Sequence, residues 1–364
     1  MISWRSGHVA ALGRAWRGTR ELAVDIDRPD ADPQQVKALA YPALTGEPRV
    51  GDRVILNTTA LELGLGTGGY AMVVALPDRL PADPPPGPGH LVKARYTPLQ
   101  AIVLGADEQE SEHHALLEDA DSIDGMPVVT ADLHSALPAV CAAILADRPG
   151  TRIAYVMSDG GALPLWFSRS VAGLREADWL IGSVTVGQAF GGDLEAVTVH
   201  TGLLAARLIL GADVAVITQG PGNLGTGTRW GFSGVACGEA VNATGALGGR
   251  PVGVLRVSEA DPRARHLGLS HHSLTSYGRV ALAPAELAVP AEEGAFWDRV
   301  REQAEALKPR HVLRPIQCDG LDEALERSPV GLSTMGRGPA QDRANFIAAA
   351  AGGRLAAALL DAEQ

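Results

Sequence analysis

The stretch DVAVITQGPGNLGTGT, residues 213–228, joins a run of apolar residues to a loop rich in glycine. A short, continuous apolar run is typical of a strand that is buried on both faces of a parallel sheet. Similar runs recur at 101–105, 127–131, 153–157, 179–186, 252–257 and 312–316. Segments rich in alanine and leucine separate most of them, at 137–145, 203–210 and 235–247, and a further helical segment ends the chain at 344–358. This alternation predicts an α/β domain with a doubly wound, mostly parallel sheet over residues 100–364, which we describe as Rossmann-like.

The first 80 residues follow a different pattern. Their apolar runs are short and are separated by turn residues, at 7–16, 21–27, 36–41, 53–59 and 70–76. Five short strands at this spacing predict a small N-terminal β-barrel or sandwich over residues 1–80. The stretch PADPPPGPG, residues 81–89, is rich in proline and therefore stiff, so residues 81–99 are expected to connect the two domains.

The composition limits the class of partner. Of the 364 residues, 46% are hydrophobic and 20% are charged, which is typical of a globular protein with a sizeable core. The formal net charge is −11 at pH 7, whereas binding to a phosphate backbone needs clustered lysine and arginine. We therefore expect a small-molecule ligand, no nucleic-acid partner and no membrane partner. The sequence is also compatible with a homo-oligomer.

The cysteines and the apolar segments indicate the cellular compartment of the protein. Cys141, Cys237 and Cys318 lie far apart without a CxxC pair, which argues against disulfides and zinc knuckles. Cys141 and Cys237 fall in alanine-rich helical stretches and are expected to pack as small apolar residues. The N-terminal residues lack a signal-type apolar region, and no apolar run is long enough to cross a membrane. These observations predict a cytoplasmic protein.

Ligands of open α/β sheets bind beyond the carboxyl ends of the strands. Polar or glycine-rich residues follow five of the predicted strands, at 132–135, 158–161, 187–195 and 220–228, and after the fifth strand at 258–263 and 270–273. Because the carboxyl ends of parallel strands share one edge, we expect these segments to form one composite site. The facing walls of that site are predicted to be SDGGALP, residues 158–164, and GPGNLGTGT, residues 220–228.

Three residues are candidates for acid–base catalysis. Asp159 precedes two glycines that leave its carboxylate exposed, which suits a general base or a metal ligand, with helix capping as the alternative. His271 and His272 are the other candidates, with a hydrogen-bonded structural histidine as the alternative. Adjacent residues point in different directions in regular structure, so we expect at most one of these histidines to face a given ligand.

The pattern Gly-x-Gly-x-x-Gly at 220–225 has the spacing of a dinucleotide-binding loop. Later glycines delay the following helix to about residue 235, and Glu259, the first acid after the next strand, lies too far along the chain. No lysine precedes a serine or threonine there, as a P-loop requires. A conventional NAD or ATP site is therefore disfavoured, and the cofactor remains unassigned. The loop is instead predicted to bind an anion through backbone N–H groups and hydroxyls. The predicted ligand-binding residues are Ser158, Gly160, Gly161, Gly220, Gly222, Asn223, Gly225, Thr226, Gly227, Thr228, Arg263 and Arg265.

A second interpretation is a metal-dependent hydrolase. Asp132 and His134 form an Asp-x-His at a strand end, which suits a divalent metal as well as it suits a helix cap. Asp193 would join them, together with Asp159 and one histidine of the 271–272 pair. Asp193 and Glu195 share a side if the chain is extended, whereas a helix start is favoured for Glu195. For Lys93 and Arg95 we expect a solvated role, with added positive charge at the domain interface as the alternative.

Several strings resemble one bacterial family of unknown function, known from actinobacteria and Firmicutes. They are GDRVILNTTALELGLGTGGY, GHLVKARYTPLQ, MSDGGALP, VGQAFGGDLEAV, GPGNLGTGTRWGFSG, DPRARHLGLSHHS and STMGRG. The resemblance covers nearly the whole chain and implies a cytosolic bacterial protein. It implies no activity, cofactor or catalytic residue.

The leading functional hypothesis is an enzyme, a hydrolase or a transferase, that acts on a small anionic or phosphorylated metabolite at the carboxyl ends of the strands. The alternatives are the metal-dependent hydrolase and a non-catalytic protein that senses a ligand or acts as a scaffold.

Overall fold

The computed structural model describes residues 1–27, 34–65 and 68–361. The chain forms two compact units. One unit comprises Met1–Pro88 with Ala94–Ile102, and the other comprises Gly89–Lys93 with Val103–Gln364. The first unit thus includes most of the proline-rich stretch that the sequence predicted as a connection.

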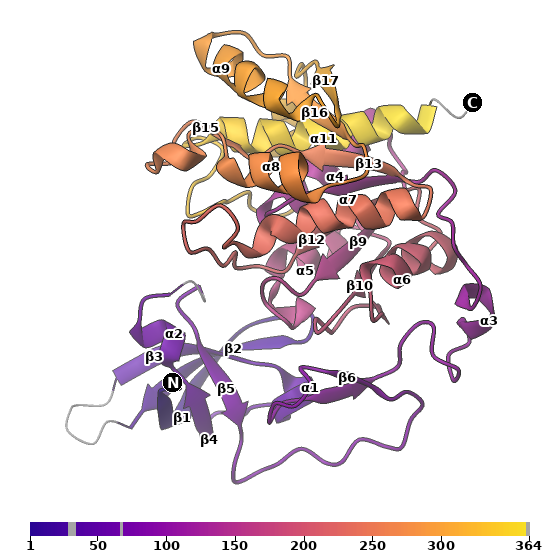
Figure 1. Cartoon of the computed structure of the whole chain (residues 1–364). Helices are drawn as coiled ribbons and strands as arrows, with labels where there is room; N and C mark the ends of the chain where they lie inside the picture. Colours follow the sequence, from indigo (N-terminus) through magenta and orange to yellow (C-terminus); the bar gives the residue numbers. More distant parts are fainter. Residues whose placement is uncertain (28–33, 66–67, 362–364) are drawn as a thin grey trace. The chain divides into compact units, whose positions relative to one another are not determined.

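The first unit is built on a closed five-stranded barrel, which confirms the predicted small β-barrel (Figure 1). Its strands are β1 (Trp4–Trp16), β2 (Thr19–Ile26), β3 (Gln34–Ala40), β4 (Arg53–Asn57) and β5 (Ala71–Ala75), in the order β1-β2-β3-β5-β4. Alternate residues along a strand point to opposite faces, and Leu22, Val24 and Ile26 accordingly fill the barrel interior. The short helices α1 (Pro42–Thr45) and α2 (Thr59–Glu62) complete this unit.

The second unit contains an eight-stranded sheet in which every pair of neighbouring strands is parallel. Its strands are β8 (Pro127–Thr130), β9 (Ile153–Ser158), β10 (Gly182–Thr185), β11 (Leu194–Glu195), β12 (Val214–Gln219), β13 (Arg250–Val254), β16 (Glu286–Pro290) and β17 (Val312–Ile316). The order across the sheet is β11-β10-β9-β12-β8-β13-β16-β17. The α/β prediction is therefore confirmed.

The predicted parallel sheet and the observed one differ at three strands. The apolar run at 101–105 forms only the short strand β7 (Ala101–Val103), which is not part of the eight-stranded sheet. The strands β11 and β16 were not predicted. Strand β11 is a two-residue edge strand, and β16 begins with Glu286 and ends with Pro290, which leaves an apolar run of only three residues, Leu287–Val289.

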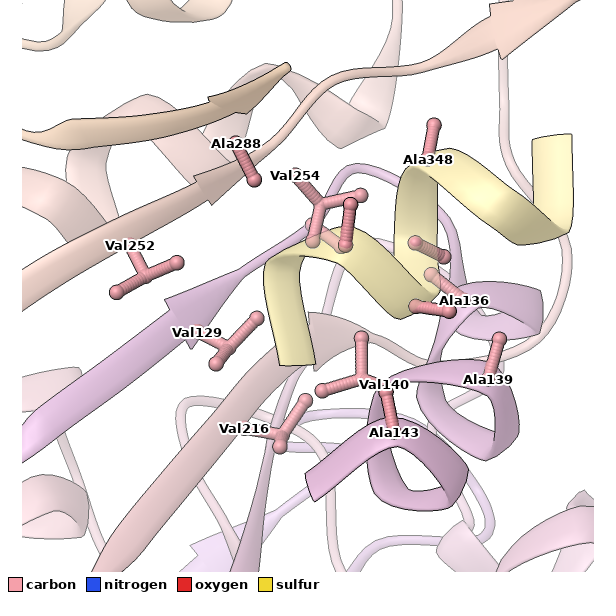
Figure 2. Close-up of a cluster of buried hydrophobic side chains, with 14 of the residues drawn as sticks. Val129, Ala136, Ala139, Val140, Ala143, Val216, Val252, Val254, Ala288 and Ala348 are labelled. Carbon is pink, nitrogen blue, oxygen red and sulfur yellow. The ribbon is translucent and has the colours of Figure 1, made fainter. Parts of the chain in front are cut away.

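Helices cover both faces of the sheet (Figure 1). Helices α4 (Leu137–Asp147) and α11 (Arg343–Asp361) pack with Val129 and Val216 on one face (Figure 2). Helices α6 (Val199–Leu204) and α7 (Ala236–Ala246) pack with residues such as Val128 on the other face. Successive residues of one strand thus serve opposite faces, as the doubly wound prediction requires.

Helices α4 and α11 cross closely, because α11 carries two adjacent glycines. A Cβ atom on Gly352 would lie 2.6 Å from Cγ2 of Val254 in strand β13. A Cβ atom on Gly353 would overlap the carbonyl oxygen of Val140 in α4. The absence of a side chain at these two positions therefore sets the distance between the helices and the sheet.

The remaining elements include α3 (His114–Leu117), α5 (Arg169–Glu176), α8 (His271–Thr275), α9 (Ala295–Ala304), α10 (Leu321–Glu326), β6 (Leu91–Lys93) and the antiparallel pair β14 (Val257–Ser258) and β15 (Gly268–Leu269). Cys141 and Cys237 are buried in α4 and α7, as predicted, and both thiols are free. Within the described ranges, no helix has the length and apolar character to cross a membrane.

Candidate functional site

Asp132, Arg256 and His272 form a buried cluster at the carboxyl edge of the sheet. Asp132 follows β8 and Arg256 follows β13, and these two strands are neighbours. Oδ2 of Asp132 lies 3.3 Å from Nη1 of Arg256 and 3.3 Å from Nδ1 of His272. The cluster is thus built from two strand ends and the first turn of α8.

The pKa of the Asp132 carboxyl group is low despite its burial. Burial alone would raise its pKa, but Arg256 and His272 hold the pKa below its usual value. A buried carboxylate is stable only when it is paired and hydrogen-bonded. The charge of Arg256 and the hydrogen bond to His272 therefore stabilise the Asp132 carboxylate.

Three histidines gather beside this carboxylate. The ring centroids of His271 and His272 are 4.5 Å apart, and the His266 ring lies 4.9 Å and 4.8 Å from them. The His272 ring also stacks on Phe232, with centroids 3.7 Å apart and an angle of 5° between the rings. Nδ1 of His266 lies 2.7 Å from Oγ of Ser270, the residue that caps α8.

The expectation that at most one of the adjacent histidines faces a given ligand stays a prediction, but the structure brings both rings into one cluster. Residues in a helix are rotated by only about 100° from one to the next, because a turn holds 3.6 residues. His271 and His272 begin α8, and His266 fills the angle between their rings. One imidazole atom in this group, Nε2 of His271, is buried and has no hydrogen-bond partner among the residues that the structure describes.

Two of the three imidazoles are neutral at neutral pH. Burial, aided by Arg256 and His272, lowers the pKa of His266 to about 3. Burial, aided by His272 and Arg265, lowers the pKa of His271 to about 4. Each neutral ring has one nitrogen with a free lone pair, which can accept a proton or a metal ion.

A pocket of about 640 Å³ adjoins the histidine cluster, and we call it the arginine pocket. His271 is part of its wall, together with three arginines. The lining residues are Gly227, Arg229, Arg265, His271, Leu274, Thr275, Gly278, Arg279, Ala306 and Leu307. Over residues 1–27, 34–65 and 68–361, no ion pair forms to any of these three arginines. The arginine pocket is thus cationic in a chain whose net charge is −11.

Arg263 and Arg265, the two arginines predicted to bind the ligand, have different surroundings. Arg263 donates two hydrogen bonds to the carboxylate of Asp261, at 2.9 Å and 2.8 Å. Arg265 lies in the wall of the arginine pocket, and a Cβ atom on Gly227 would come within 3.5 Å of its Nη2. Arg265 thus lines the arginine pocket, whereas Arg263 is paired with Asp261.

A second, smaller pocket of about 150 Å³ lies at the ends of β8, β9, β10 and β12. Ser158, Asp159 and Gln219 line it, and Oδ2 of Asp159 accepts a hydrogen bond from the Gln188 N–H at 2.9 Å. The sequence grouped Asp159 with the histidines in one site, whereas the structure divides them between two pockets. The catalytic role of Asp159 stays a prediction.

The loops at 158–164 and 220–228 contact each other directly. The N–H of Gly220 donates to the Ser158 carbonyl at 3.2 Å, and the N–H of Ala162 donates to the Pro221 carbonyl at 2.9 Å. A Cβ atom on Gly161 would overlap the carbonyl of Gly220. These glycines therefore allow two backbone segments to pack tightly.

The glycine-rich loop uses several of its own polar groups internally. The N–H groups of Leu224 and Thr226 donate to Oγ of Ser233 at 3.0 Å and to the carbonyl of Gly231 at 2.7 Å. Oδ1 of Asn223 accepts from Oγ of Ser233 at 3.0 Å.

The backbone has positive φ angles of 94° at Gly222 and 81° at Gly227, which explains why glycine occupies these two positions. Gly225 pairs with Phe232 in an isolated β-bridge. Oγ1 of Thr228 lies 3.1 Å from Oγ1 of Thr226. Gly160, in the neighbouring loop, packs against the side chain of Gln219. Anion binding by this loop stays a prediction.

The predicted metal ligands lie in different surroundings. His134 has both ring nitrogens occupied, by Tyr155 Oη at 2.9 Å and by Ser168 Oγ at 2.7 Å. Asp193 accepts hydrogen bonds at 2.8 Å from the backbone N–H and the hydroxyl of Ser183. Among the predicted metal ligands Asp132, His134 and Asp193, Asp132 is the one that lies beside the histidine pair.

Glu195 and Lys93 are buried next to each other, and the sequence-based expectation for each of them differs from the structure. Glu195 lies in the strand β11 rather than at a helix start. Nζ of Lys93 donates to the carbonyls of Gly187 and Ala196 at 2.9 Å each, and lies 3.4 Å from Oε2 of Glu195. Lys93 is fully buried, so the expectation that it is solvated is wrong.

Sequence reasoning missed Arg256, Arg229 and Arg279. Arg256 stands two residues after the end of β13 and could have been found by starting the search at the strand end. Arg229 directly follows the glycine-rich loop, whereas Arg279 follows α8, and no local pattern connects the two.

The protein is an α/β protein with an N-terminal closed β-barrel. A cluster of three histidines lies at the carboxyl ends of the strands of its parallel sheet. A family model described as "Protein of unknown function (DUF3866)" matches residues 37–353, and the chain belongs to this family. The match confirms the resemblance to a family of unknown function. No curated protein matches the chain. The bacterial source stays a prediction.

Proposed function

We propose that the protein is an enzyme that acts on a small anionic molecule, such as a phosphorylated metabolite, bound in the arginine pocket. One observation carries the proposal: Arg229, Arg265 and Arg279 line one pocket with His271, and in the described part of the chain none of these arginines is paired with a carboxylate. The planar guanidinium group binds phosphate and carboxylate groups through two parallel hydrogen bonds. The free positive charges thus favour an anion as the ligand.

The neighbouring histidines support a catalytic role over simple binding. His271 belongs both to the wall of the arginine pocket and to the cluster with His266 and His272. An anion held by the arginines therefore lies next to imidazole rings whose free lone pair can accept a proton or a metal ion. Strongly lowered histidine pKa values are frequent at functional sites.

The proposal includes a cytoplasmic location. The three cysteines are free and buried, which is usual for proteins of a reducing compartment.

Anion binding tests the first half of the proposal. We expect titration calorimetry with inorganic phosphate to detect binding that falls at least tenfold in the variant Arg265→Gln/Arg279→Gln. Arg299→Gln on helix α9, an exposed arginine outside the pocket, is the matched control and should bind phosphate as the unmodified protein does. Equal phosphate binding by all three proteins would overturn the proposal.

Turnover tests the second half. We expect hydrolysis or group transfer with at least one member of a panel of phosphate monoesters, and we expect Arg265→Gln/Arg279→Gln to lower kcat/KM by at least tenfold. Phosphate binding without turnover of any compound in the panel would favour the sensing protein over the enzyme.

A further inference from the structure

We propose that His266, His271 and His272 bind one divalent transition-metal ion, with Zn²⁺ the expected type. Imidazole nitrogens are common ligands of zinc, and three histidines with one open position form a known catalytic arrangement. This proposal deepens the proposed function, because it names what the histidine cluster supplies beside the arginine pocket. The binding of the ion itself does not depend on that function.

The geometry of the three rings fits such an ion after a small adjustment. One ligand nitrogen from each histidine can be chosen so that all three lie within 4.8 Å of one another. A tetrahedral zinc ion with bonds of about 2.0–2.1 Å brings its ligand nitrogens to about 3.4 Å from each other. All three side chains come from the segment 266–272, so rotations of the side chains can close the difference.

The surroundings leave the outer nitrogens for a metal. Nδ1 of His266 faces Oγ of Ser270, and Nδ1 of His272 faces the carboxylate of Asp132. Histidines that bind metals usually donate the proton of their other nitrogen to such an oxygen, which fixes the tautomer. Nε2 of both rings then keeps its lone pair.

The third histidine provides an independent observation. Nε2 of His271 is buried, and no protein group within the described residues makes a hydrogen bond to it. A buried polar atom without a partner costs free energy, and native proteins rarely keep one. A metal ion between the three rings would give this nitrogen its missing partner.

The contact between Arg256 and His272 decides whether His272 can bind a metal ion. Its Nη1 lies 3.0 Å from Nδ1 of His272, and 3.3 Å from the Asp132 carboxylate. If Arg256 donates to Nδ1, the His272 proton moves to Nε2, and that nitrogen cannot bind a metal. Metal binding therefore requires the tautomer in which Nδ1 donates to Asp132.

Charge predicts what fills the open position of the ion. Asp132 is compensated by Arg256, and the three imidazoles are uncharged ligands, so the ion keeps its double positive charge. His271 connects the ion to the arginine pocket. We expect a water molecule or an anion as the fourth ligand, and we expect phosphate and Zn²⁺ each to strengthen binding of the other.

The first experiment uses the full chain after removal of metals with a chelator. Titration calorimetry with Zn²⁺ should give about one equivalent, and Co²⁺ should give the visible absorption of a tetrahedral site. His266→Gln, His271→Gln and His272→Gln should each weaken Zn²⁺ binding at least a hundredfold, whereas His200→Gln, an exposed histidine on α6, should not. Asp132→Asn should weaken it about ten- to a hundredfold, because it removes the carboxylate that orients His272.

The outcomes separate this proposal from the proposed function. Less than a tenth of an equivalent of Zn²⁺ and no visible Co²⁺ band in the unmodified protein would overturn the metal site, even if the histidine variants fail to fold. Folded histidine variants that bind Zn²⁺ normally would overturn the ligand assignment. Zn²⁺ binding without any phosphate binding would leave the metal site standing and overturn the arginine pocket. Phosphate binding without Zn²⁺ binding would do the reverse.

Discussion

Oδ2 of Asp132 lies 3.3 Å from Nδ1 of His272, although 140 positions separate the two residues in the chain. Asp132 also lies 3.3 Å from Nη1 of Arg256, which stands beyond the neighbouring strand β13. A single buried carboxylate thus connects two strand ends with the histidine cluster. Its dependence on Arg256 is the first property to test.

Arg256→Met should lower the free energy of unfolding by about 3–5 kcal/mol, because it leaves the carboxylate of Asp132 buried beside a histidine alone. Adding Asp132→Asn removes the uncompensated charge and should restore most of this loss. The measurement is urea unfolding of the two single variants and the double variant. If the losses of the two single variants simply add in the double variant, Asp132 and Arg256 do not stabilise each other.

The fold could be predicted because its strands carry their own signal. The runs at 127–131 and 153–157 are almost entirely apolar, since helices cover both faces of the sheet, and they form β8 and β9. Strand β16 has a charged first residue, Glu286, and a proline at its end, so its burial depends on neighbours that the local sequence does not show. The edge strand β11 is fixed by its parallel pairing with β10 rather than by its composition.

From the sequence, the candidate site could be predicted only as the set of segments that follow the predicted strands, without the arrangement of their side chains. That Asp132 and the histidine pair lie near the carboxyl ends of the strands follows from their positions in the chain, whereas the role of the pair stays a prediction. The arrangement of Arg229, Arg265 and Arg279 depends on how three separate segments pack, which no spacing rule gives. The same limit explains why the sequence joined Asp159 and His271 in one site. Both follow strand ends, but they line different pockets.

Lys93 and Glu195 form a second buried ion pair to test. Burial lowers the pKa of Lys93 and raises the pKa of Glu195, while each partner acts against that shift in the other. Lys93→Met should lower the free energy of unfolding by about 3 kcal/mol, because the Glu195 charge is then buried without its partner. Adding Glu195→Gln should restore most of the loss in urea unfolding, since the amide oxygen can still accept from Oγ1 of Thr185. A double variant no more stable than Lys93→Met would contradict this account.

Gly353→Ala should lower the free energy of unfolding by about 1–3 kcal/mol. Alanine favours helices over glycine by about 1 kcal/mol, but here its Cβ atom would overlap the carbonyl of Val140 in α4, and the overlap costs more. The matched control is Gly331→Ala, where a Cβ atom meets nothing within 4 Å, and whose stability should change by less than about 0.5 kcal/mol. Thermal and urea unfolding measure both. A Gly353→Ala variant as stable as the unmodified protein would show that α4 and α11 can separate without cost.

His134 should make the protein sensitive to mild acid. Burial lowers its pKa to about 4, from 6.5 in an unfolded chain. Between these two values the unfolded chain binds more protons than the folded one, so the stability from the neutral His134 is complete above pH 6.5 and is lost as the pH falls toward 4. From pH 7 to pH 4.5 this single group accounts for a loss of about 2 kcal/mol.

Replacing the titrating ring isolates this contribution. His134→Asn keeps polar atoms near Tyr155 and Ser168 but has no proton to gain in this range. Urea unfolding at pH 7 and pH 4.5 should therefore show a loss of stability about 2 kcal/mol smaller in His134→Asn than in the unmodified protein. His200→Gln, an exposed histidine, should lose as much as the unmodified protein. Equal losses in all three proteins would show that His134 is not the group whose protonation destabilises the fold, whatever the absolute stability of the variant at pH 7.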